Sequence, residues 1–170
     1  MENRAPQGHP CRMKTPLLAV LILASCGLAT PAAAQNDTAE VLAVVQRMFD
    51  AMRSKDTAAL RAAWIPGGKL WGLRTRQDGS TVLQQTTEQQ FAEAVARDTR
   101  GVWDERTFNP EVRLDGNMAT VWVAYDFWLG TQFSHCGVDS FQMLKTAEGW
   151  KVVNVVDTFQ RTGCPQRPAR

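Results

Sequence analysis

The sequence predicts an α+β domain with helices on one face of an antiparallel sheet. Apolar residues recur at helical spacing near the start of the chain, whereas apolar and polar residues alternate after Gly101, as they do in strands. Turn signals such as Asp115-Gly116-Asn117 separate the alternating segments in the manner of hairpins. Helices that precede a meander of strands are expected to cover one sheet face, which is the α+β arrangement.

Two helices are expected before the first strand. The first spans residues 37–55, with Asp37 as its cap and Glu40 closing a capping box. A short second helix covers residues 57–64 and ends at the Pro66-Gly67-Gly68 turn. The first helix carries one apolar stripe, made of Val41, Val44, Val45, Met48, Phe49 and Met52.

A hairpin and a third helix follow. Short strands over residues 69–76 and 80–84 flank the turn signal Asp78-Gly79. Thr87, with Gln90 three residues later, is expected to cap the third helix. Four longer strands then complete a meander, over residues 107–114, 118–129, 133–145 and 150–160.

The N-terminal segment has the pattern of a secretory signal peptide. Lys14 precedes the apolar run Leu17–Ala24, and Ala32-Ala33-Ala34 forms an A-x-A cleavage site before Gln35. Residues 1–34 are therefore predicted to be a signal peptide that starts with a misassigned extension. The domain is expected over residues 35–165, followed by a tail at 166–170.

A second cleavage pattern lies inside the same segment. Leu23-Ala24-Ser25-Cys26-Gly27 resembles a bacterial lipobox, in which the cysteine is acylated and becomes the new N-terminus. Either cleavage exports the domain, so we expect a periplasmic or secreted protein or, alternatively, a lipoprotein anchored through Cys26. The apolar run is too short to span a bilayer, which takes roughly 20 residues.

Charge excludes one class of partner. Removing residues 1–34 takes away three of the 19 basic and one of the 17 acidic residues, which leaves 16 of each. A chain of zero net charge without a basic stripe is not expected to bind nucleic acid. The same cut leaves two cysteines, Cys136 and Cys164, and an even pair in an exported protein favours a disulfide over a metal site.

The order of elements resembles the nuclear transport factor 2-like superfamily. Three stretches carry the resemblance: AMRSKDTAALRAAWIPGG (51–68), SFQMLKTAEGWKVVNVVD (140–157) and the longer segment from His135 to Pro165. The last of these is most similar to the lumazine-binding or polyketide-cyclase-like subgroup. The chain departs from many relatives at Gly67-Gly68, where they have an aspartate after the proline turn.

The resemblance implies a cone, in which a curved antiparallel sheet carries the three helices on its concave face around a pocket. The superfamily contains dehydratases, isomerases, cyclases, hydrolases and simple ligand binders, so the fold alone does not select a function.

Strand alternation predicts the residues of the pocket. With a four-residue turn at 130–133, Asp126 and His135 become diagonal neighbours on one face, and Asp139 lies farther along it. His135 is the candidate acid–base group, with Asp126 or Asp139 as its orienting carboxylate. The expected ligand-binding residues on this face are Trp122, Trp128, Phe141, Met143 and Asn154.

The opposite face is the alternative. If it is the buried one, Tyr125, Ser140 and Asp157 become the candidates. His135 and Asp139 are about 13 Å apart along an extended strand, so HCGVD is not a compact metal motif, and neither a metal nor a cofactor is expected.

The expected function is binding of a small apolar or aromatic molecule in the cone. The first alternative is a cofactor-independent isomerase, dehydratase or cyclase that uses His135. The second is an interaction module that forms a homodimer through its sheet.

Overall fold

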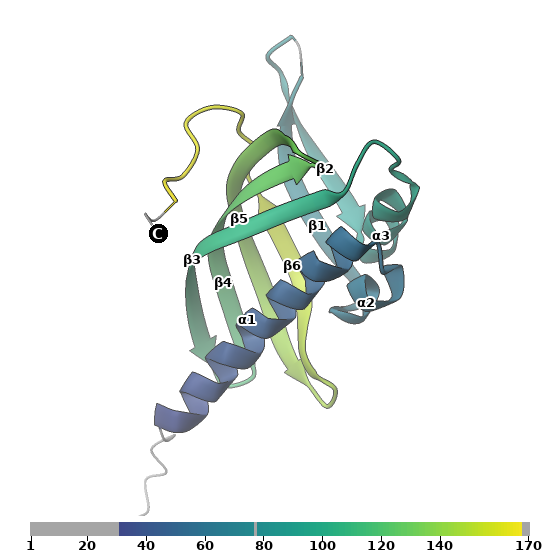
Figure 1. Cartoon of the computed structure of the whole chain (residues 1–170). Coiled ribbons are helices and arrows are strands. Elements are labelled where there is room, and N and C mark those ends of the chain that lie inside the picture. Colours follow the sequence, from purple (N-terminus) through teal and green to yellow (C-terminus); the bar gives the residue numbers. More distant parts are fainter. Residues whose placement is uncertain (1–30, 77, 168–170) are drawn as a thin grey trace, which may run out of the picture.

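A computed structural model describes residues 31–76 and 78–167 of the chain. It contains three helices and one six-stranded sheet (Figure 1). The helices are α1 (Pro31–Ser54), α2 (Thr57–Ala62) and α3 (Glu88–Arg97). The strands are β1 (Trp64–Thr75), β2 (Thr81–Thr87), β3 (Trp103–Asp115), β4 (Met118–Leu129), β5 (Gln132–Thr146) and β6 (Gly149–Asp157). The predicted α+β class is confirmed.

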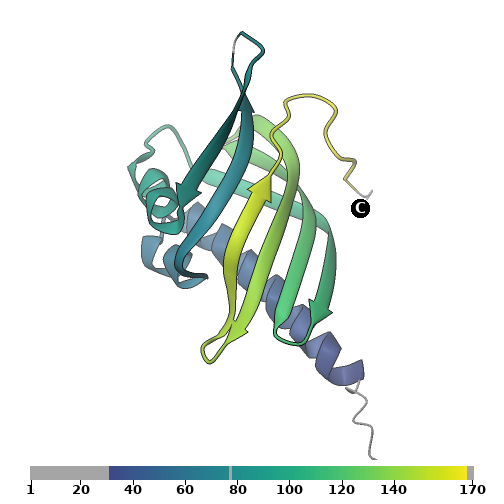
Figure 2. The same ribbon diagram turned by 180° about the vertical axis from the view of Figure 1, so that it is seen from behind.

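The sheet is curved and open, and α1 lies across its concave face (Figures 1 and 2). Its strand order is β2-β1-β6-β5-β4-β3. The meander β3 to β6 is antiparallel throughout, as predicted, because each connection is a short turn. The β1–β2 hairpin extends the sheet through a parallel pairing of β1 with β6. Turn residues predict pairing only between consecutive strands, so the sequence did not indicate this pairing.

The first helix is longer than predicted. It begins at Pro31, so Asp37 lies within the helix and does not cap it. The preceding residues Ala32 to Asn36 continue the helix, and proline is favoured in a first helical turn. The carboxylate of Asp37 instead accepts a hydrogen bond of 2.5 Å from Lys145 on β5. None of the helices in the described part of the chain is long and apolar enough to cross a membrane.

The other two helices begin as predicted. The side chain of Asp56 accepts a hydrogen bond from the backbone N–H of Ala59 at the start of α2. At the start of α3, Thr87 and Gln90 form a complete capping box. These caps stabilise two short helices that would otherwise leave backbone donors unpaired.

The predicted register between β4 and β5 is wrong by one residue. The connection is a two-residue turn, Gly130-Thr131, and the strands then shift register between Phe127 and Trp128. Phe127 therefore faces His135, where the four-residue turn at 130–133 would have placed Trp128. Because side chains alternate, this offset turns every β4 side chain to the face opposite to the one predicted.

A second irregularity separates Gln142 from Met143 in the pairing of β5 with β6. Lys145 pairs with Trp150 on the turn side of the irregularity, whereas Asp139 faces Asp157 beyond it. Asp157 is therefore an inner residue, which corrects its sequence-based assignment to the opposite face.

The core lies between α1 and the concave face. It combines the predicted stripe of α1 with inner residues of the sheet, for example Val121, Val123 and Phe141. The rings of Phe49 and Phe141 meet edge to face, with centroids 6.1 Å apart. Burying a side chain of this size contributes about 1.5–3 kcal/mol, so this contact fixes α1 on the sheet.

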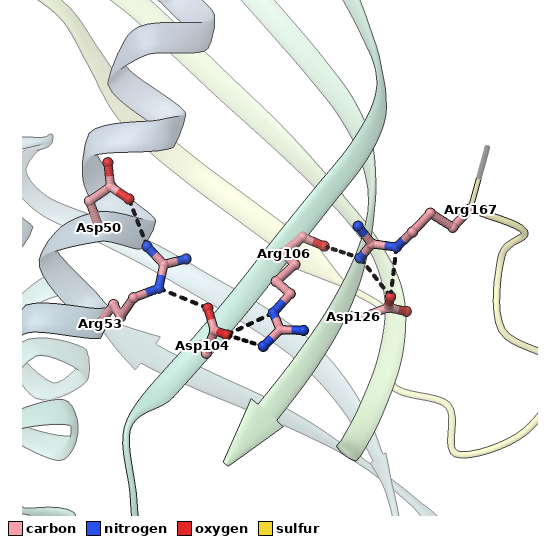
Figure 3. A network of polar contacts seen from close by, with 6 residues as sticks. All are labelled: Asp50, Arg53, Asp104, Arg106, Asp126 and Arg167. Atoms are coloured by element: carbon pink, nitrogen blue, oxygen red, sulfur yellow. Dashed lines mark hydrogen bonds and ion pairs between the residues drawn. The ribbon is translucent and has the colours of Figure 1, made fainter. Parts of the chain in front are cut away.

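Ion pairs connect α1 to β3, and β4 to the C-terminal segment (Figure 3). Arg53 of α1 binds Asp50 and Asp104, and Asp104 also binds Arg106 on β3. In the tail, Arg167 binds Asp126 of β4 at 2.7 Å. Partly exposed pairs of this kind contribute about 0–1 kcal/mol each, so they orient the elements more than they stabilise them.

Cys136 and Cys164 form a disulfide, as the sequence predicts, with their Cα atoms 5.7 Å apart. The backbone of Cys136 also exchanges two hydrogen bonds with Gln160. The segment that follows β6 is thereby attached to β5 through Gln160 and Cys164.

We expect replacement of Cys164 by alanine to lower the free energy of unfolding by about 3–4 kcal/mol, because the disulfide closes a loop with a sequence separation of 28. Urea unfolding of the oxidised wild type and the variant measures this. Ser54→Ala, a change on the exposed surface of α1, is the control. Equal midpoints for the wild type with and without reductant would contradict the assignment.

Candidate functional site

A cavity of about 340 Å³ lies between the concave sheet face and the helices α1 and α3. Side chains from all six strands line it, and most of its wall is apolar. The aromatic members are Phe49, Trp64, Phe91, Trp103, Tyr125, Phe127, Phe141 and Phe159. Polar groups converge on the part of the wall where β5 meets β6, which is the usual composition of a small-molecule site.

Two carboxyl groups share a hydrogen bond in this wall. Asp139 of β5 is only 4% exposed, and Glu105 reaches it from β3. Burial raises the pKa of Asp139 to about 7, although the hydrogen bond from Glu105 works in the other direction. Burial and the neighbouring Asp139 together raise the pKa of Glu105 well above its usual range. Because the shared hydrogen bond raises the pKa of Glu105 and lowers that of Asp139, Glu105 is its donor and Asp139 its acceptor.

A third carboxylate of the cavity, that of Asp157, is neutralised by an arginine. Asp157 of β6 accepts two hydrogen bonds from Arg74 of β1, at 2.6 and 2.9 Å. A two-point pair of this geometry is strong and directional. Gly72 makes it fit, because a Cβ atom there would collide with both the Asp157 carboxylate and the Arg74 guanidinium. The charges of Arg74 and Asp157 cancel, so the pair itself adds no net charge to the cavity.

His135 is held between aromatic rings. It stacks on Phe159 with ring centroids 4.0 Å apart and on Phe127 at 4.7 Å. Its Nδ1 lies 3.0 Å from the hydroxyl of Ser134. Burial, with a smaller contribution from the positive charges of Arg74 and Arg161, lowers the pKa of His135 to about 4. The imidazole is therefore neutral at physiological pH.

Tyr125 completes the polar wall. Its hydroxyl donates a hydrogen bond of 2.7 Å to the backbone carbonyl of Thr158. Burial, followed by the nearby carboxyl groups, raises the pKa of Tyr125, so the phenol stays protonated. The hydroxyl therefore ties β4 to the segment that follows β6, next to the cavity.

The structure brings together only some of the residues expected at the site. His135, Asp139 and Phe141 line the cavity. The β4 residues Asp126, Trp122 and Trp128 are instead on the outer face because of the register shift. Trp122 is 54% exposed, and Asp126 binds Arg167 of the tail.

Two further expected ligand-binding residues lie outside the cavity. Asn154 is on the outer face, because the irregularity between β5 and β6 precedes it. Met143 points inward but is part of the packed core. The expected homodimer through the outer sheet face stays a prediction.

The sequence analysis missed Glu105 and Arg74, and it named Asp157 and Tyr125 only as candidates of the opposite face. One signal for Glu105 was present, because Asn109-Pro110 interrupts β3 and proline inside a strand marks a bulge. The strand does shift register there, between Phe108 and Glu111, which turns Glu105 inward. No local signal indicates the Arg74–Asp157 pair, because it depends on the parallel pairing of β1 with β6. Within the described residues, no three histidine, cysteine or acidic side chains are grouped so that they could hold a metal ion.

The curved sheet, its helices and the cavity between them are those of an NTF2-like α+β domain. More specifically, the chain belongs to the family described as "Putative lumazine-binding", whose profile matches residues 36–157. A comparison with curated protein sequences finds no match.

Solved structures share the fold at low sequence identity. An NTF2-like protein with a cystatin-like fold from Novosphingobium aromaticivorans has a TM-score of 0.62 and 16% identity, covering 81% of this chain and 94% of its own. An NTF2-like protein from Shewanella baltica has a TM-score of 0.59 and 15% identity, covering 75% and 97%. A protein from Streptomyces avermitilis, described as a putative dehydratase of the NTF2-like family, has a TM-score of 0.58 and 14% identity, covering 74% and 97%. At these identities the likeness shows the fold alone.

The raised pKa of Asp139 predicts a pH-dependent stability. The folded protein binds the Asp139 proton more tightly than the unfolded chain does, so this stabilisation is full below about pH 4 and is lost as the pH rises through 7. We expect the unfolding free energy of the wild type, minus that of Asp139→Asn, to fall by about 1–3 kcal/mol between pH 4 and 8. Urea titrations at several pH values measure it, and Asp126→Asn is the matched control on the outer face. A difference that rises with pH would contradict the assignment.

Proposed function

We propose that the chain is an exported domain that binds a small molecule in the cavity between α1, α3 and the sheet. The observation that carries this proposal is the cavity itself, which has aromatic walls and a small set of polar groups gathered at one side. The description of the family, lumazine binding, supports the same class of function.

Export rests on the N-terminal pattern, with cleavage before Gln35 or at Cys26. Cys26 lies outside the described residues, whereas the Ala32-Ala33-Ala34 site and Gln35 lie at the start of α1. The disulfide between Cys136 and Cys164 supports export, because structural disulfides form mainly in oxidising compartments.

Blocking the cavity tests the binding function. Ala94 of α3 lines the cavity, whereas Ala96 of the same helix is exposed and does not. We expect Ala94→Trp to fill the cavity and to abolish ligand retention, and Ala96→Trp to leave it unchanged. Native mass spectrometry of the two variants and the wild type, freshly purified from the native host, measures bound small molecules.

The same spectra give the mass of the mature chain. A chain that begins at Gln35, or at an acylated Cys26, supports export, and an uncleaved cytosolic form contradicts it. A ligand that is retained equally by Ala94→Trp and Ala96→Trp would place binding outside the cavity.

A second candidate function is acid–base catalysis without a cofactor, of the isomerase, dehydratase or cyclase kind. The specific observation that favours it is the raised pKa of Asp139, about 7, because a general base works best when its pKa is near the ambient pH. His135, the base expected from the sequence, has a pKa lowered to about 4 and is clamped between two rings. Asp139 is therefore the better base, and His135 acts as a wall residue.

For this second candidate, we expect the rate constant of any turnover to rise with pH along a limb near 7. Asp139→Asn should lower the rate by about 10²–10⁴-fold and remove the limb, since that is the usual contribution of a general base. His135→Phe, which preserves the stack, should retain both. If His135→Phe removes the limb and Asp139→Asn does not, the assignment of the base is wrong.

A further inference from the structure

The cavity contains more acid than base. Three carboxyl groups line it, from Glu105, Asp139 and Asp157, and two arginines, Arg74 and Arg100. Arg74 is committed to Asp157 by its two hydrogen bonds, and Arg100 is paired with Asp98 outside the cavity. Glu105 and Asp139 are left without a cation of their own.

The lack of a paired cation matters most for Asp139, because this residue is buried. Its side chain is almost fully buried, and across the described residues no lysine, arginine or histidine lies within ion-pair distance of Asp139 or Glu105. Buried carboxylates are normally paired with a cation or with several N–H donors, because an unpaired buried charge is costly. Here the hydrogen-bond partner is another acid, and Asp139 faces an open volume.

The walls around this volume suit a positive charge. Most of the remaining lining is apolar, and it includes several aromatic side chains, among them Phe49, Trp103 and Phe141. Aromatic faces attract cations, and the attraction grows when water is excluded. A carboxylate next to aromatic walls therefore provides both an ion pair and an apolar enclosure for an ammonium group.

From this arrangement we propose that the ligand of the cavity is an organic cation, an amine with an apolar or aromatic body whose ammonium group binds the Asp139 carboxylate. The proposal rests on the proposed ligand-binding function and names the class of its ligand. Glu105 keeps its proton and donates to the second oxygen of Asp139, while the apolar body lies among the rings. The cation replaces the proton of Asp139, which leaves to bulk water.

Binding should therefore depend on pH. Below the pKa of Asp139 the cation must displace a proton, so its affinity should increase up to tenfold per pH unit and become constant above about pH 7. The lining residues of α1 and β2 carry no charge. The titratable and charged groups that face this end of the cavity from the other elements are Arg74, Arg100, Glu105, Tyr125, His135, Asp157 and Arg161. Across the range from pH 5 to 8, the lowered pKa of His135 keeps it neutral and the raised pKa of Tyr125 keeps it protonated, while the raised pKa of Glu105 favours its protonated form.

Three probes of one shape test the charge of the ligand. The purified domain, with its disulfide intact, is titrated with 3-phenylpropylamine, 3-phenylpropan-1-ol and 3-phenylpropanoate by isothermal calorimetry at pH 6 and pH 8. At pH 8 we expect the amine to bind at least tenfold more tightly than the alcohol, and the carboxylate to bind most weakly. At pH 6, titrations in two buffers with different ionisation enthalpies should show the release of close to one proton per amine bound.

Variants assign the preference to Asp139. Asp139→Asn should lose the tenfold preference for the amine and the proton release, while it still binds the alcohol. Glu105→Gln should keep the preference, because its amide can still donate to Asp139. Asp126→Asn repeats the acid-to-amide change on the outer face and should behave as the wild type.

The outcomes distinguish failure of the cation proposal from failure of the proposed binding function. If the alcohol or the carboxylate binds as tightly as the amine, the ligand is not a cation and the proposed binding function stands. If none of the three binds, binding in the cavity is contradicted and the cation proposal falls with it. The comparison of probes on the wild type decides this even if Asp139→Asn fails to fold.

Discussion

Single-residue irregularities in strand pairing determine which chemistry this domain encloses. The sheet shifts register at four places, in the pairings β1–β6, β3–β4, β4–β5 and β5–β6. Each shift reverses the face on which the residues beyond it project. Because of these shifts, Glu105, Tyr125 and Asp157 point toward α1 together with Asp139, instead of toward solvent. Without the shifts the same strands would pair, but the interior would contain a different set of side chains.

Close approach of the backbone maintains this arrangement. Gly137 allows the segment after β6 to lie directly against β5, because a Cβ atom there would collide with the carbonyl group of Thr158. The same carbonyl accepts the hydrogen bond from Tyr125, and the segment continues into Phe159, which stacks on His135. The disulfide lies a few residues beyond. The end of the chain is thus part of the wall of the cavity.

The general architecture was accessible from the sequence, whereas most of the site was not. Helical periodicity predicted α1, capping residues predicted the start of α3, and turn residues predicted the meander, because all of these depend on local interactions. His135, Asp139 and Phe141 were correctly placed on one face, since alternation within β5 is also local. The β4 candidates were wrong because the strands shift register by one residue between Phe127 and Trp128, which no local pattern in the sequence indicates.

Other parts of the site depend on long-range pairing, which no local pattern reports. Arg74 meets Asp157 only because β1 lies parallel to β6, and the two residues are 83 positions apart. Glu105 meets Asp139 across an intervening strand, β4. A pocket that is lined by six strands can be predicted residue by residue only when all the strand registers are known.

The two aspartates of the cavity, Asp157 and Asp139, are neutralised in different ways. Asp157 is neutralised by an arginine that never loses its proton, so it contributes a fixed, uncharged part of the wall. Asp139 is neutralised only by a proton, which an incoming group can replace. His135 does not take over this role, because its aromatic neighbours favour the neutral ring and its lowered pKa keeps it uncharged. The interior therefore has one exchangeable proton near neutral pH, on the Asp139 side of the pair. Both the binding of a cation and the transfer of a proton to or from a ligand would act through that single group, and they differ in whether the proton leaves to water or moves to the ligand.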